Sequence, residues 1–286
     1  MSTYPDPLAQ SRRTTDRLFY ATGVLLDAQD FLDEQTYHRG RQARALHFLH
    51  GSGTAAGLRV VYEAEVPAAD GNPGREERLL VHPGVAVDRL GRLIEVPSTV
   101  CLRVQRWFAA NAADLPILVA DASSDGTPRP ARVEVDLYLR YVACEQGKTP
   151  AMASGPYDAL NAVQPSRLRD YYDIDLIVRD RADAPLPFDH WASAVEGVDP
   201  ADRPAALREA IYTAWDVAAR VSSQDELNRL PEYVFGQDPT GVFLARVTIP
   251  ATAGPPATRA PGDVSVSDRG RLFAYTTAAL LAWLGL

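Results

Sequence analysis

Apolar residues alternate with other residues along two stretches in the middle of the chain. Between Val133 and Tyr141 every second residue is apolar, and the residues between them include Glu134 and Asp136. The stretch from Tyr172 to Val178 repeats this pattern. Because successive side chains of a strand point to opposite faces, a period of two predicts strands with one buried and one solvated face, as in antiparallel sheets.

Shorter apolar runs predict further strands at residues 58–64, 79–81, 85–88, 93–96 and 242–249. The turn residues from Asp88 to Gly91 join two of these runs, which predicts a β-hairpin. The glycine-rich residues 51–57 predict a close chain reversal between a helix and a strand. They do not predict a phosphate loop, because no helix and no Gly-Lys-Ser/Thr motif follows them. The Gly- and Pro-containing residues 146–165 predict a loop.

Helical patterns occur in three places. Asp27 is suited to cap a helix that runs toward Leu49, and Asp30 stands three residues later, where a capping-box acid belongs. Residues 200–220 carry apolar side chains at helical spacing, and residues 271–284 predict a last helix that is apolar on most faces.

These elements predict an α+β fold. Its antiparallel β-rich core carries an N-terminal helix, a helical segment near residues 200–230 and a C-terminal helix. We divide the chain into an N-terminal arm (1–18), a main β-rich domain opened by the long helix (19–180), a helical segment with a return strand (181–249), and a Pro-rich arm with the C-terminal helix (250–286).

Composition narrows the class of protein. The 286 residues are 46% hydrophobic, which is enough to bury a core. The net charge of -8 disfavours binding to nucleic acid. The start of the chain lacks a signal-peptide pattern, and no apolar run is long enough to insert into a membrane, so we expect synthesis in the cytoplasm. Cys101 and Cys144 are expected to be buried thiols.

Four side chains near the long helix could in principle bind a metal ion. Glu34 and His38 are four residues apart, and His47 and His50 are three apart. However, more than two helical turns separate the first pair from His47, and no His-Glu-x-x-His motif is present. Hydrogen bonding at the helix end is the favoured interpretation of His38, His47 and His50. Asp173, Asp175 and Asp180 lack the loop of a calcium site, so we predict no metal and no cofactor.

The sequence gives little support for acid–base or nucleophilic catalysis. Asp88 and Glu95 flank the hairpin and are expected to be solvated, and His82 lies in a turn. Residues 189–191, Asp-His-Trp, have no partner nucleophile motif. We therefore predict no catalytic residues.

The last helix is the most unusual feature, because its apolar side chains are too many for a solvated end. It either tucks into the core or docks on a partner subunit. The residues that we expect at such an interface are Arg271, Phe273, Leu280, Leu281, Trp283 and Leu284.

Several motifs resemble a bacterial protein family whose genes accompany phage-tail-like contractile injection systems. The motifs are residues 20–31 (YATGVLLDAQDF), Glu34-Gln35, Tyr37-His38-Arg39, Leu49-His50-Gly51, Gly57-Leu58, residues 81–88 (VHPGVAVD), residues 91–96 (GRLIEV) and residues 166–172 (SRLRDYY). Thr54-Ala55-Ala56 departs from the bulkier residues of the family's glycine turn, and no cysteine precedes Gly57.

The resemblance implies a structural component of such a particle, not an enzyme, located at the baseplate or tail tip. It would act through protein–protein assembly with other subunits, and a homo-oligomer is compatible with this role. The protein would be cytoplasmic until its particle is released or docked at a membrane. Two alternatives stay open: a metal-dependent hydrolase of cell-wall material, and a sugar- or receptor-binding module that uses Tyr157, Tyr171, Tyr172 and Trp191.

Overall fold

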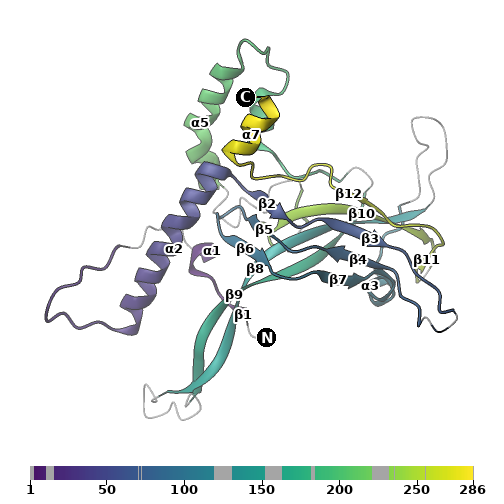
Figure 1. Cartoon of the computed structure of the whole chain (residues 1–286), viewed down its shortest axis with the longest axis horizontal. Coiled ribbons are helices and arrows are strands. Elements are labelled where there is room, and N and C mark those ends of the chain that lie inside the picture. The colour runs from purple at the N-terminus through teal and green to yellow at the C-terminus, as the bar shows by residue number, and fades with distance from the viewer. Residues whose placement is uncertain are drawn as a thin grey trace.

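The computed structural model describes residues 3–10, 16–69, 71, 73–118, 131–151, 163–181, 184–220, 232–234, 236–254 and 256–285. The fold is α+β, as predicted: antiparallel sheets form the core, and helices near both ends and near residue 210 project from it (Figure 1). The helices are α1 (Pro7–Gln10), α2 (Ala28–His50), α3 (Val104–Asn111), α4 (His190–Val195), α5 (Arg203–Arg220) and α7 (Thr277–Leu284).

The strands form one large and two small sheets. They are β1 (Thr3–Tyr4), β2 (Gly53–Gly57), β3 (Val60–Glu63), β4 (Arg78–Val81), β5 (Gly84–Val87), β6 (Leu93–Val96), β7 (Val100–Arg103), β8 (Arg132–Pro150), β9 (Val163–Arg179), β10 (Val242–Thr252), β11 (Thr258–Arg259) and β12 (Ser265–Ser267). The small sheets have the orders β2-β5-β6 and β3-β4-β7. In the large sheet, β8 pairs with β9 along its length and with β10 and β1 on its other edge.

The core lies between the large sheet and the two small ones. Two clusters of buried side chains join β8 and β10 to the small sheets, and α3 closes one end through Phe108. Each of the four segments into which we divided the sequence contributes a strand to the large sheet, because β1, β8, β10 and β11 all belong to it. The predicted hairpin is confirmed as β5 and β6, which pair antiparallel.

The prediction that β8 has a solvated face was wrong. Asp136 and Tyr138 are as deeply buried as the apolar residues between them. Arg179 of β9 donates to Asp136 over 2.7 Å, and Arg246 of β10 donates to the same carboxylate over 2.7 and 3.0 Å. The polar face is therefore an internal layer of ion pairs, which the alternation of residue types cannot distinguish from a solvated face.

Two predicted loops are partly strands. The glycine-rich segment forms β2, where Gly57 has a φ of 62° and a Cβ would lie 2.1 Å from the Pro83 carbonyl oxygen. Only glycine permits β2 to approach β5 so closely. The loop predicted for residues 146–165 contains the ends of β8 and β9, which continue as a paired ribbon to Pro150 and from Val163; residues 152–162 lie outside the described part.

The Pro-rich segment after Ile249 is packed rather than free. β10 continues to Thr252, β11 pairs with it, and Ala257 and Val264 are buried in the core. The last helix begins at Thr277 instead of residue 271, because residues 272–274 lie along β2: the Thr54 amide donates to the Leu272 carbonyl, and the Ala274 amide donates to the Thr54 carbonyl, each over 2.9 Å. Cys144 is buried as expected, whereas Cys101 is exposed.

The long helix α2 lies mostly outside the core. Its predicted capping box is confirmed: Asp27 accepts from the amides of Gln29 and Asp30, and Asp30 accepts from the Asp27 amide. Ala43 is its only buried residue, so packing covers little of the helix. Among the helices that the structure describes, none is long and apolar enough to cross a membrane.

Replacing Asp136 tests the buried ion-pair layer. Asp136→Ala leaves Arg179 and Arg246 without their carboxylate, so we expect the free energy of unfolding to fall by about 3–5 kcal/mol. Chemical denaturation would measure this. Asp173→Ala is the matched control, because Asp173 shares the half-exposed Arg140 with Asp175 and its loss should cost about 1 kcal/mol or less. Equal losses of stability from the two substitutions would contradict the assignment of Asp136 to a buried layer of ion pairs.

Candidate functional site

The β5–β6 hairpin begins a cluster of buried charges. Asp88 directly follows β5 and is fully buried, and its Oδ1 accepts from the backbone amides of Leu90 (2.9 Å) and Arg92 (2.8 Å). This local turn is typical of aspartate, whose short side chain can bond the backbone that follows it. Gly91 completes the turn with a φ of 84°. We expected Asp88 to be solvated, and this was wrong, because the turn faces the protein interior.

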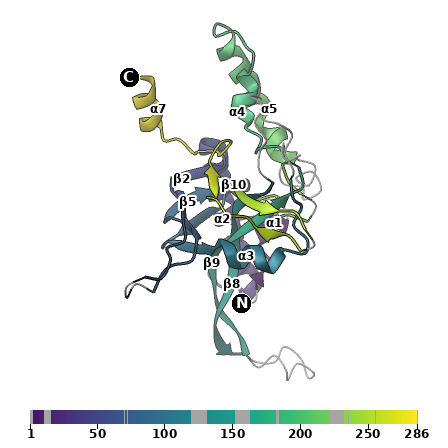
Figure 2. The ribbon, with the colours of Figure 1, turned by 90° about the vertical axis from the view of Figure 1, so that its right-hand side faces the viewer.

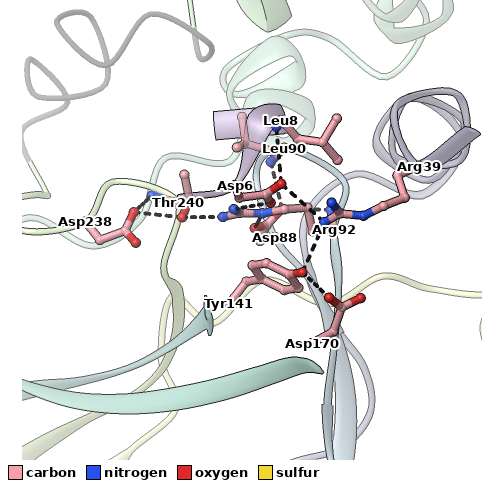
Figure 3. Close-up of polar contacts among 10 residues, drawn as sticks. All are labelled: Asp6, Leu8, Arg39, Asp88, Leu90, Arg92, Tyr141, Asp170, Asp238 and Thr240. Atoms are coloured by element: carbon pink, nitrogen blue, oxygen red, sulfur yellow. Dashed lines mark hydrogen bonds and ion pairs between the residues drawn. The ribbon is translucent and has the colours of Figure 1, made fainter. Parts of the chain in front are cut away.

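Arg92 lies at the centre of this cluster (Figure 3). Its Nε donates to Asp88 over 2.6 Å, its Nη1 to Asp6 over 3.0 Å, and its Nη2 to the Thr240 hydroxyl over 2.9 Å. The guanidinium lies 4.6 Å from the centroid of the Tyr141 ring. One side chain thus connects the N-terminal segment, the hairpin, β8 and the segment before β10.

Arg39 of α2 extends the cluster toward the surface. Its Nη2 lies 3.2 Å from Asp6 and donates to the Tyr141 hydroxyl over 3.0 Å. That hydroxyl in turn donates to Asp170 of β9. Asp6 therefore contacts the guanidinium groups of both Arg39 and Arg92, and these contacts hold the start of the chain against α2 and the hairpin. We name the set Asp6, Arg39, Asp88, Arg92, Tyr141, Asp170 and Thr240 the Arg92 cluster.

The pKa values of three cluster members are shifted, and burial raises the pKa of Asp88 against the opposing effect of Arg92. Burial opposes the charge of Arg92, but Asp88 and Asp6 raise its pKa above the ordinary value of arginine. Burial and the hydrogen bond to Asp170 raise the pKa of Tyr141. Tyr141 therefore stays protonated at neutral pH and serves as a hydrogen-bond donor. These properties suit a cluster that holds elements together.

A cleft of about 310 Å³ opens beside the cluster. Its walls come from α1, α2, β6, β8 and β9; they comprise Leu8, Arg39, Gln42, Ala43, Leu46, Gly91, Arg92, Leu93, Glu95, Tyr141, Asp170 and Tyr171. The described walls contain the carboxylates of Glu95 and Asp170 but no serine, cysteine or histidine. The mixed apolar and charged lining is suited to contact with another polypeptide segment.

The candidate metal ligands of α2 lie along the helix without converging. His38 Nε2 is 3.8 Å from Glu34, His47 stands edge-on to the Phe48 ring at 5.2 Å, and His50 is exposed at the end of the helix. In the described ranges no group of three metal-ligating side chains comes together.

The other sequence candidates have structural contacts. Asp173 and Asp175 both pair with Arg140, over 2.6 and 2.7 Å. Asp189 caps α4, and His190 Nε2 lies 3.3 Å from the Ala210 carbonyl oxygen, which joins α4 to α5.

Of the remaining candidates, Glu95 is exposed and lies in the wall of the cleft beside the Arg92 cluster, and His82 is partly buried. The aromatic candidates for sugar binding lie apart: Tyr171 and Tyr172 stack at 4.7 Å on β9, Trp191 is exposed on α4, and Tyr157 lies outside the described residues.

The largest apolar exposure lies at the start of α2. Leu25 is 93% exposed and Phe19 is 82% exposed, and four neighbours are also exposed. We name this group the α2-start surface; it comprises Phe19, Tyr20, Val24, Leu25, Phe31 and Leu32. Such a concentration of bare apolar side chains marks an interaction site in a folded protein. Sequence reasoning missed it, because apolar residues beside a helix start normally indicate core packing.

The predicted interface residues divide into three groups. Phe273, Leu280 and Leu281 are exposed, so α7 does not tuck into the described core. Arg271 is instead held within the chain, donating to the Thr54 hydroxyl over 2.9 and 2.7 Å. Trp283 and Leu284 belong to α7, and their side chains lie outside the described part.

Replacing Arg92 tests whether the cluster fastens the start of the chain. Arg92→Met leaves Asp6 and Asp88 buried without a cation, so we expect a loss of about 3–5 kcal/mol in the free energy of unfolding and faster amide hydrogen exchange in residues 6–10. Arg41→Met, on the exposed side of α2, is the control and should change stability by about 0.5 kcal/mol or less. Unchanged exchange in residues 6–10 would refute the fastening role.

Comparison with known proteins identifies no family for this chain. Neither a scan against models of protein families nor a search of curated proteins finds a match. The function must therefore be argued from the residues and their geometry.

Proposed function

We propose that this protein is a structural, non-enzymatic subunit of a phage-tail-like contractile injection system, associated with the baseplate or tail tip, and that it acts by assembling with other subunits. The observation that carries the assembly role is the large apolar exposure on elements that project from the core. α2, α5 and α7 all extend beyond the sheets, as both views show (Figures 1 and 2).

The exposed side chains on these projections are large. They include Leu25 and Phe31 near the start of α2, Phe48 and Leu49 at its end, Ile211 and Tyr212 on α5, and Leu280 and Leu281 on α7. Burying such side chains against a partner stabilises a complex by about 25 cal/mol per Å² of apolar surface. Groups of exposed apolar side chains are typical of surfaces that contact a partner.

The kind of particle is inferred from the sequence motifs. These motifs supply much of the Arg92 cluster: Arg39 ends the Tyr-His-Arg motif, Asp88 ends residues 81–88, Arg92 belongs to residues 91–96, and Asp170 belongs to residues 166–172. Their contacts hold α2, the hairpin and β9 together. The motifs thus have a scaffold role, which supports a structural subunit over an enzyme.

The proposal is tested by asking whether the protein is retained in purified particles. Particles sedimented from a producing strain should contain the protein at a fixed ratio to the other subunits, as measured by quantitative mass spectrometry. Absence of the protein from such particles would overturn the proposal.

Substitution of α7 tests the contact surface. Leu280→Ser/Leu281→Ser removes apolar side chains that are 38% and 44% exposed, so the fold should stay intact while the amount of protein in sedimented particles falls at least about fivefold. Val66→Ser is the matched control, because Val66 is 38% exposed and lies in the loop between β3 and β4. Full retention of the α7 variant would exclude this helix as a contact.

A further inference from the structure

We infer that copies of this protein associate head to tail, with the β8–β9 ribbon of one copy seated on the α2-start surface of the next. The inference rests on the proposed assembly function and names a second copy as one partner. We name the ribbon formed by residues 142–150 and 163–171 the hairpin arm; it projects away from the sheets and apart from α2 (Figure 1).

The hairpin arm presents one basic face. Arg167 and Arg169 are two residues apart on β9 and so lie on the same face. Lys148 of β8 is directly opposite Pro165, which places it on that face too. All three cations are exposed, and no ion pair is found for them among the described residues. The exposed Val163 belongs to the same face.

The arm also offers an open strand edge. Among the described strands β9 pairs only with β8, so the backbone groups on its outer edge have no strand partner. Charged side chains and Pro165 on such an edge prevent indiscriminate strand pairing.

The α2-start surface has the opposite charge. From residue 18 to residue 38 the chain contains four carboxylates and no lysine or arginine: Asp27, Asp30, Asp33 and Glu34. Asp30, Asp33 and Glu34 follow the spacing of one helix side. In the described part of the chain their contacts are with backbone amides and with the side chains of Gln29, Tyr20 and His38. Among the residues that the structure describes, no arginine forms an ion pair with these carboxylates.

Charge complementarity favours a second copy as the occupant. The protein has a net charge of -8, so two copies repel unless a local basic face meets an acidic one. The hairpin arm and the α2-start surface provide that pair, each with exposed apolar side chains beside its charges. Since the two patches differ, the contact is heterologous, and repetition gives a closed ring or an open filament.

Charge-reversal variants of the full chain test the pairing by analytical ultracentrifugation. Wild-type protein should self-associate in a concentration- and salt-dependent way. The arm variant Arg167→Glu/Arg169→Glu and the helix variant Asp33→Arg/Glu34→Arg should each self-associate at least about tenfold more weakly, because like charges then face each other. Mixing the two variants should restore association, since each then meets a surface of opposite sign.

The control variant changes the net charge from -8 to -12, as the arm variant does, at residues that belong to neither surface. Arg41→Glu/Arg59→Glu replaces two exposed arginines and should associate within about twofold of wild type. Circular dichroism would verify that every variant is folded. An unfolded helix variant is replaced by Leu25→Ser, which removes the most exposed apolar side chain of the surface and should likewise weaken association.

Three outcomes would overturn the inference: wild-type protein that stays monomeric at all concentrations, charge-reversed variants that associate like wild type, or a mixture that fails to restore association. These outcomes are separate from the particle test. If the protein is found in sedimented particles but is monomeric when purified, the proposed function is supported and only the pairing between copies is refuted. If the purified protein self-associates but is absent from particles, the pairing between copies is supported and the proposed function is refuted.

Discussion

One buried carboxylate organises the large sheet. Asp136 stands near the start of β8 and accepts from an arginine of each neighbouring strand, Arg179 and Arg246. A one-residue slip of either strand would move its arginine to the opposite face and leave a buried charge unpaired, so the ion pairs specify the register on both sides. Arg246 also donates to the carbonyls of Ala184 and Pro185, which positions the chain that leads into α4 and α5.

The Arg92 cluster connects the β5–β6 hairpin of one small sheet to the rest of the fold. A single guanidinium gathers segments that lie 86 and 148 residues from it in the sequence. Both sites place arginine where its planar fork can serve several acceptors at once, a task for which lysine is poorly suited. The rigid core that results can present long projections whose own packing is slight.

Local patterns in the sequence predicted local features well. The Asp27 cap, the β5–β6 hairpin and the alternation of β8 each depend on residues within a few positions of one another. The burial of Asp136 was not predictable, because its partners are 43 and 110 residues away. The start of α7 was misplaced because Arg271 is bound to Thr54, 217 residues earlier. The α2-start surface escaped notice because exposure depends on what the rest of the fold fails to cover.

The position of β10 in the chain bears on how the protein matures during translation. β8 and β9 leave the ribosome well before β10, so the ribbon exists first with one edge of β8 unoccupied over residues 132–139. Pairing across such a sequence separation is slow, since a long loop must close first. α7 is synthesised only after β10. The order of synthesis thus delivers the strand that completes the core ahead of α7, so this helix becomes available to a partner only after the large sheet can close.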